Sequence, residues 1–119
     1  MPRKILLVVK SPPYGSVLAA ECLRIATAMI AMDFLPQVLF IDDGVYFLLK
    51  GQNPEKAGLR SFHERLKTLA DLIGLCVAEH SLHKRSIKKT DFNENYRLKT
   101  VSMEEVTNLF LENETVITF

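Results

Sequence analysis

The chain has 119 residues, of which 48% are hydrophobic, and its 15 basic and 14 acidic residues leave a formal net charge of +1. This length suits one domain with its own core, and the near-zero charge excludes a protein that attracts polyanions over its whole surface. The two cysteines form no C-x-x-C pair, which excludes a disulfide framework and a closed structural zinc site. No apolar run approaches the ~20 residues of a membrane span, and the apolar run after Lys4 is too short for a secretory signal. We therefore expect one domain over residues 1–119, in the cytoplasm, with no membrane contact.

Apolar runs and helical patterns alternate along the chain. Residues 5–9 form an apolar run without polar alternation, which is typical of a central parallel strand covered on both faces. This alternation of strands and helices predicts βαβ units with right-handed crossovers. The expected fold class is α/β: a single domain with a five-stranded, mostly parallel, doubly wound sheet and helices on both faces. In chain order we expect strands at 5–9, 36–41, up to 76, near 98–101 and at 115–119. We expect helices at 17–32, 61–72, 77–86 and 102–112, and a short helix or turn at 45–49.

The expected helix at 17–32 is unusually apolar. Two apolar rows run along it, and Glu21, Arg24 and Thr27 form only a thin polar stripe. Cys22 lies on one of the apolar rows, so we interpret it as a core residue. Because one side of a sheet cannot cover both rows, we infer that this helix also contacts another subunit or a second covering element.

Asp42 and Asp43 follow the second expected strand. Carboxylates at the carboxyl end of a strand are candidates for a divalent-ion or phosphoacceptor site. The alternative is that one of them caps the next helix, because Asp is a favoured N-cap residue. We favour the cap, since a hard cation needs more oxygen ligands than this stretch offers.

Cys76 is expected where a buried strand runs straight into a helix. A thiol at that position would face unpaired backbone N–H groups and the positive end of the helix dipole, and both favour the reactive thiolate. Open α/β sheets also place their working groups at the carboxyl ends of their strands. The alternative is a small buried cysteine that only packs in the core.

His80 and His83 follow Cys76 at spacings that would place all three residues on one face of a helix. One hypothesis is that either histidine stabilises a Cys76 thiolate, which would make a nucleophile or a sulfur carrier. A second hypothesis is an open metal site, but the sequence offers no evident fourth ligand. A hydrolase has no support, because neither a G-x-S-x-G motif nor a Ser-His-Asp order is present.

Residues 84–99 contain six basic residues and two acidic ones, together with Phe92 and Tyr96. A basic stretch with aromatic residues is a candidate for RNA contact. The alternative, which we favour, is a solvated crossover connection.

A capping box begins the last expected helix, with Ser102 as the N-cap and Glu105 three residues later. The apolar spacing that follows predicts that this helix buries Met103, Val106 and Phe110.

Four stretches of the sequence resemble the DsrE/DsrF-like sulfur-relay family, and the second is most similar to its TusC/DsrF branch. This second stretch runs from Phe40 to Pro54 and contains an Asp-Gly-Val-aromatic segment followed by Leu-Leu and Gly-Gln-Asn-Pro. The other three are Ser11-Pro12-Pro13-Tyr14-Gly15, Cys76 with Ser81-Leu82-His83-Lys84-Arg85, and Val116-Ile117-Thr118-Phe119.

The resemblance implies a five-stranded DsrE-like fold and a role in relaying persulfide sulfur, towards tRNA 2-thiouridine or in sulfur oxidation. It implies a hetero-oligomer with TusD/DsrE-like and TusB/DsrH-like subunits, and a sulfur-carrier protein and an indirect link to tRNA are candidates for further partners. We expect no cofactor and no metal. Cys76 would be the candidate sulfur carrier, with His80 and His83 as candidate thiolate stabilisers. The alternative is a catalytically silent subunit that scaffolds a partner's sulfur-carrying cysteine.

Overall fold

The computed structural model describes residues 4–12, 17–49, 63–92 and 96–119. The loop expected at 50–54 and the first residues of the helix expected from 61 lie outside these ranges. None of the helices in the described ranges is both long enough and apolar enough to span a membrane.

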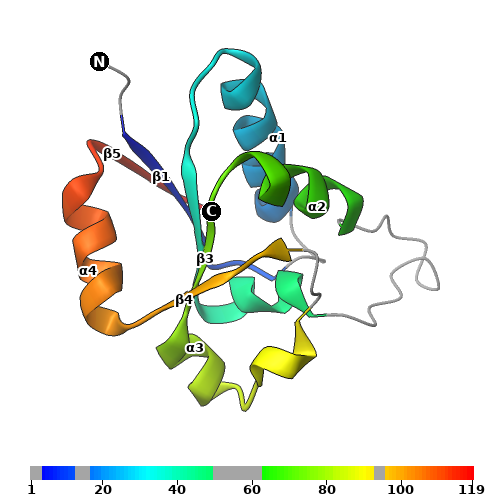
Figure 1. The fold of residues 1–119 in the computed structure, drawn as a ribbon, viewed down its shortest axis with the longest axis vertical. Helices are drawn as coiled ribbons and strands as arrows, with labels where there is room; N and C mark the ends of the chain where they lie inside the picture. Colours follow the sequence, from blue (N-terminus) through cyan, green and yellow to red (C-terminus); the bar gives the residue numbers. More distant parts are fainter. Residues whose placement is uncertain (1–3, 13–16, 50–62, 93–95) are drawn as a thin grey trace.

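A five-stranded sheet forms the centre of the molecule (Figure 1). The strand order is β4-β3-β2-β1-β5, and every neighbouring pair is parallel. The sequence-based prediction of a parallel α/β sheet is therefore confirmed, and β1 has the bounds expected from its unbroken apolar run. The strands are β1 (Ile5–Val9), β2 (Gln37–Phe40), β3 (Leu75–Ala78), β4 (Lys99–Val101) and β5 (Thr115–Thr118).

Helices cover both faces of the sheet, as predicted. Figure 1 shows α1 and α2 on one side and α4 on the other, while α3 lies beyond the carboxyl ends of the strands. A seven-residue 3-10 helix, η1, follows β2 and lies at that same edge. The helical elements are α1 (Leu18–Ala31), η1 (Asp42–Leu48), α2 (His63–Leu72), α3 (Glu79–Lys84), η3 (Lys89–Asp91) and α4 (Met103–Glu112).

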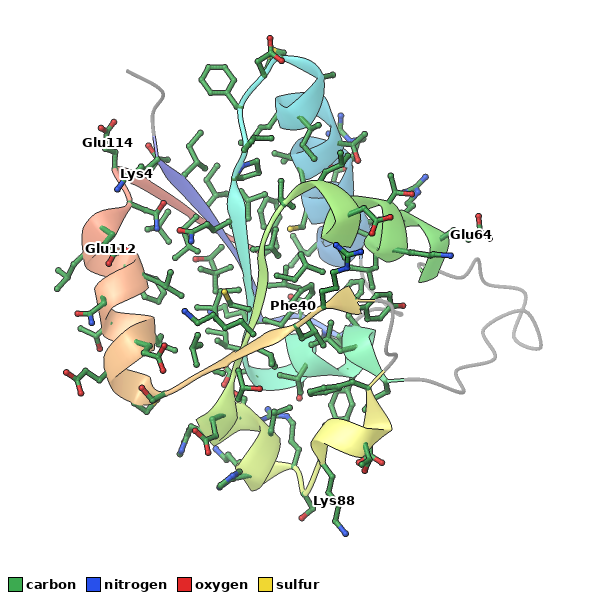
Figure 2. All side chains as sticks on the ribbon, viewed as in Figure 1. Lys4, Phe40, Glu64, Lys88, Glu112 and Glu114 are labelled. Atoms are coloured by element: carbon green, nitrogen blue, oxygen red, sulfur yellow. The ribbon has the colours of Figure 1, made fainter. Side chains whose placement is uncertain are left out.

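The core has two parts, one on each face of the sheet. Because side chains alternate along a strand, neighbouring residues of one strand belong to different parts. Leu75 and Val77 of β3 belong to the part under α1 and α2, whereas Cys76 belongs to the part under α4. Figure 2 shows Phe40 of the first part inside the molecule, while Glu64 and Lys88 point away from it.

The α1 helix confirms the interpretation of Cys22. This residue is 1% exposed and packs in the core part under α1 and α2. Glu21 and Arg24 form an ion pair on the opposite, solvent side of the helix.

The capping box of α4 is confirmed, because Ser102 Oγ accepts a hydrogen bond from the Glu105 backbone N–H and Glu105 Oε1 accepts one from the Ser102 backbone N–H. The predicted buried face is wrong at two of three positions. Met103 is 59% and Phe110 39% exposed, while Leu109 is buried with the partly buried Val106. The helix has apolar residues on two neighbouring rows, and packing on the sheet selects the row through Val106 and Leu109.

Candidate functional site

Cys76 lies inside β3 and does not begin a helix. The α3 helix begins at Glu79, and its N-cap is Ala78. The expected strand–helix junction at Cys76 is therefore wrong by two residues. The physical reason is that β3 stays paired with β4 through Val77 and Ala78, and Ala78 lies opposite Val101 of β4.

The Cys76 side chain faces α4 in an apolar setting. It is 7% exposed and shares a cluster with Leu39, Val101 and Leu109. Burial raises the pKa of the Cys76 thiol above its ordinary value. The positive charge of Lys99 acts in the opposite direction and lowers this pKa, while the negative charge of Glu105 raises it further. Burial therefore favours the protonated thiol over the reactive thiolate.

A cleft of about 380 Å³ borders Cys76, between the β3–β4 edge of the sheet and α4. Lys99 of β4 and Glu105 of α4 both line it, with Lys99 Nζ 3.8 Å from Glu105 Oε2. The other polar side chains in the lining are Gln37, Arg97, Asn108 and Glu112. The thiol thus lies at the edge of a cleft with mixed charge and not in a fully enclosed core.

His80 and His83 lie on α3, so they do not share a helix face with Cys76. Both are exposed, and His83 Nε2 is 3.7 Å from a carboxylate oxygen of Glu79 on the same helix. The structure therefore does not bring the three predicted site residues together on one helix. Across the described ranges, no group of three or more His, Cys, Asp or Glu side chains is arranged to hold a metal ion.

The carboxyl edge of the sheet is fixed by contacts between η1 and α3. Arg85, which follows α3, donates from Nε and Nη2 to Oδ1 of Asp43, at 3.2 and 3.1 Å. Its Nη1 donates to the Ser81 carbonyl oxygen at 3.4 Å, and the Asp42 N–H donates to Ser81 Oγ at 3.0 Å. The hydrogen bonds of Asp42 and Asp43 join two elements that follow different strands, whereas the bond from Arg85 to the Ser81 carbonyl oxygen orients Arg85 on α3.

The predicted capping role of Asp42 or Asp43 is wrong. The N-cap of η1 is Ile41, and no side chain caps this helix. Asp43 instead pairs with Arg85, which is 42 positions later in the sequence. The pairing partner is set by the parallel packing of β2 beside β3, so no local pattern around Asp43 indicates it. One feature of the sequence could have indicated this contact. Asp43 and Arg85 both follow expected strands, and the carboxyl ends of parallel strands lie at one edge of the sheet.

Gly44 lets η1 pack directly on the end of β1. A Cβ atom added to Gly44 would lie 2.0 Å from the carbonyl oxygen of Val9 and 2.6 Å from its carbonyl carbon. Only glycine fits this approach between two backbone segments. The η1 helix therefore covers the carboxyl end of β1, where open α/β sheets often bind ligands.

The segment after α3 does not expose its aromatic side chains. Phe92 is 8% and Tyr96 2% exposed, and both pack in the core part under α1 and α2. They are therefore not available to stack on RNA bases, although the basic residues Lys84 and Lys88 are exposed. Residues 93–95 of this segment lie outside the described ranges.

Comparison with known proteins identifies relatives over most or all of the chain. The profile of the DsrE/DsrF-like family matches residues 3–119. The intracellular sulfur oxidation protein DsrF of Allochromatium vinosum is 33% identical over 94 residues, which are 77% of this chain and 69% of DsrF. Protein TusC of Buchnera aphidicola subsp. Baizongia pistaciae is 28% identical over 120 residues, covering 98% of this chain and 99% of TusC.

A solved structure supports the fold. The crystal structure of the ychN protein from E. coli has a TM-score of 0.85 with 22% identity, and it covers 98% of this chain and 99% of ychN. The family profile match over residues 3–119 and the 33% identity to DsrF show that the chain belongs to the DsrE/DsrF-like family.

Proposed function

We propose that this chain is a structural subunit of a sulfur-relay complex and that it holds a partner's sulfur-carrying cysteine in place. The observation that supports this role is that Ala78, which ends β3 and is the N-cap of α3, has no sulfur to transfer. Its nearest thiol, Cys76, is buried and has a raised pKa. A sulfur carrier needs an accessible thiolate, so these features favour the scaffold over the carrier.

The relatives support the sulfur-relay assignment. DsrF is named for intracellular sulfur oxidation, and the match to TusC covers 98% of this chain. The partners we propose are TusD/DsrE-like and TusB/DsrH-like subunits in a cytoplasmic hetero-oligomer. Such a complex would pass persulfide sulfur to a sulfur-carrier protein or towards tRNA thiolation.

A second candidate function keeps Cys76 as a sulfur carrier, with His80 and His83 as thiolate stabilisers. The observation that favours it is the cleft beside the thiol, in which the charge of Lys99 lowers the thiol pKa. In this mechanism the Cys76 thiolate attacks the outer sulfur of a donor persulfide. The new S–S bond makes a Cys76 persulfide, and the donor leaves as a thiolate.

Persulfide mapping separates the two candidates. The chain is co-purified with a DsrE-like partner, incubated with a cysteine desulfurase and cysteine, and analysed by mass spectrometry. The scaffold role predicts an added sulfur atom on the partner's cysteine and none on Cys76. An added sulfur on Cys76, removed by a thiol reductant, would contradict the scaffold role and support the carrier.

A further inference from the structure

The cleft between β4 and α4 carries its two signs of charge on opposite walls. Lys99 of β4 and Arg97 just before it line one wall, whereas Glu105 and Glu112 of α4 line the other. Cys76 of β3 also borders the cleft. A ligand with one sign of charge would be attracted by one wall and repelled by the other. A zwitterion is attracted by both walls at once.

The contact between Lys99 and Glu105 leaves both groups available to a ligand. Their charged atoms are 3.8 Å apart, and the side chains are 71% and 46% exposed. An ion pair of this length and exposure contributes little, because water screens it. A zwitterion that enters the cleft can replace this single contact with two charge-assisted hydrogen bonds, from Lys99 to its carboxylate and from its ammonium group to Glu105.

The register of the sheet places the thiol beside the positive wall. Cys76 and Lys99 are partners in the pairing of β3 with β4, so their side chains point to the same face of the sheet. Neighbouring strands are only about 4.8 Å apart. In cysteine and its disulfide, one methylene group separates the sulfur from the carbon that bears the ammonium and carboxylate groups. A ligand of this class held by Lys99 and Glu105 therefore has its sulfur within reach of Cys76.

The size and the apolar part of the cleft suit the same ligand class. Its volume of about 380 Å³ lies within the range of roughly 300–1,000 Å³ that is usual for small-molecule sites. Val101 and Leu109 line it next to Cys76. These apolar side chains can contact the methylene groups and the sulfur atoms of a small disulfide, while its charged groups face the two walls.

We propose that this cleft binds a small zwitterionic disulfide of the α-amino-acid class, such as cystine, and that Cys76 takes up one half of it as a mixed disulfide. Cys76 loses its proton to solvent, and its thiolate attacks the nearer sulfur of the ligand. A bond forms between Cys76 Sγ and that sulfur, the S–S bond of the ligand breaks, and the other half leaves as a thiolate that takes up a proton. Cys76 is oxidised and the ligand is reduced, so no other oxidant is required.

The modification would block Cys76 reversibly, because a free thiol attacks the mixed disulfide and restores the Cys76 thiol. The inference does not rest on the proposed sulfur-relay role. A mixed disulfide adds half of the ligand to Cys76, whereas sulfur relay adds a single sulfur atom, and the two products differ in mass.

Reaction with four small disulfides tests the charge of the ligand. The folded chain is incubated with zwitterionic cystine, dianionic dithiodiglycolate, dicationic cystamine or neutral 2-hydroxyethyl disulfide, and peptide mass spectrometry follows the modification of Cys76. Each rate is divided by the rate for the same disulfide with Cys76 in the urea-unfolded chain, which corrects for intrinsic reactivity. We expect the corrected rate for cystine to exceed each of the other three by about tenfold or more, because binding holds the disulfide beside the thiol.

Three results of this series would overturn the proposal. Equal corrected rates would show that the cleft does not bind the ligand. A corrected rate for the dianion or the dication that matches or exceeds the rate for cystine would show that one wall acts alone. Absence of any modification of Cys76 in the folded chain would show that the thiol is out of reach of the cleft.

Two substitutions test the walls separately. Lys99→Gln removes the positive charge, and Glu105→Gln removes the negative charge but keeps the side-chain oxygen that the capping box requires. In each variant the ratio of the cystine rate to the neutral-disulfide rate should fall by about fivefold or more, because one charge-assisted hydrogen bond to the ligand is lost. A change in the thiol pKa alters both rates alike, so this ratio reports contact with the ligand.

The matched controls are Lys84→Gln on α3 and Glu104→Gln on α4. They remove the same charges from exposed residues that do not line the cleft, so the ratio should stay at the wild-type value. An unchanged ratio in Lys99→Gln or Glu105→Gln, or an equal fall in the controls, would contradict binding between the two walls.

Discussion

The cleft beside Cys76 and the carboxyl edge of the sheet differ in what they hold and in how firmly they are fixed. The cleft has a thiol, but the only described ion pair across it is the 3.8 Å contact between Lys99 and Glu105, whose side chains are 71% and 46% exposed. The carboxyl edge has a network of hydrogen bonds around Arg85, whose side chain is 16% exposed, but it has no thiol.

The difference shows that the thiol and the ordered edge of the sheet are in separate places in this chain. Open α/β sheets bind and react at the carboxyl ends of their strands, which is where η1 and α3 meet. Rigid packing without a reactive group suits a surface that presents a fixed shape to a partner. Substitutions at the carboxyl edge and beside Cys76 test the two regions separately.

Gly44→Ala should have the largest effect, because the added Cβ would clash with the Val9 backbone. We expect a loss of at least about 1–3 kcal/mol in the free energy of unfolding, since neither backbone segment can move freely. Urea unfolding followed by circular dichroism measures it. Gly74→Ala is the matched control: an added Cβ there has no neighbour within 4 Å, so its stability should stay close to that of the wild type. Equal stability of Gly44→Ala and the wild type would show that η1 does not press on β1.

Arg85→Met should destabilise the chain by about 1–2 kcal/mol, because it removes charge-assisted hydrogen bonds to Asp43 and the Ser81 carbonyl. The control is Arg24→Met, which removes an exposed ion pair with Glu21 and should cost no more than about 0.5 kcal/mol. Thermal unfolding of the two variants gives the comparison. If both variants melt alike, the η1–α3 contact does not fix the carboxyl edge.

The two thiols should differ in alkylation rate, with Cys76 labelled before Cys22. Cys22 is sealed in the core and its pKa is raised to about 12, whereas Cys76 borders a cleft. Because the thiolate reacts and burial raises both pKa values, both rates should be slow at neutral pH and rise about tenfold per pH unit below each pKa. Peptide mass spectrometry after limited alkylation measures the order. Equal labelling, or Cys22 first, would contradict the contrast between cleft and core.

Charged neighbours should change the Cys76 rate in opposite directions. Lys99→Gln removes the charge that lowers the thiol pKa and should slow alkylation, whereas Glu105→Gln should accelerate it. The double variant His80→Ala/His83→Ala should change the rate least, because both histidines are exposed on α3. Slower alkylation in the histidine variant than in Lys99→Gln would support the histidines as thiolate stabilisers.

Local signals in the sequence predicted the parts of the fold that depend on local chemistry. The unbroken apolar run of Ile5–Val9 and the Ser102–Glu105 capping box were both confirmed, because each feature is complete within a few residues. The alternation of strands and helices was enough to predict the parallel α/β class. These features do not depend on a distant partner.

The position of the thiol depends on a distant partner. Leu75-Cys76-Val77-Ala78 is apolar throughout, so nothing within the run indicates where the strand ends. The end is set by pairing with Val101, which is far along the chain. The Arg85–Asp43 contact likewise joins residues 42 positions apart. The structure therefore places the candidate thiol inside β3, facing α4 at the edge of a cleft, and not at the carboxyl edge of the sheet, because the strand ends two residues later than expected.

Sulfur transfer by the reconstituted complex tests the scaffold role most directly. The chain, its DsrE-like partner, a cysteine desulfurase and a sulfur acceptor are combined, and transfer by Cys76→Ala is compared with the wild type and with the core control Cys22→Ala. The scaffold role predicts that both variants assemble and transfer sulfur at the wild-type rate. Loss of transfer in Cys76→Ala alone, with the complex intact, would show that Cys76 is the carrier.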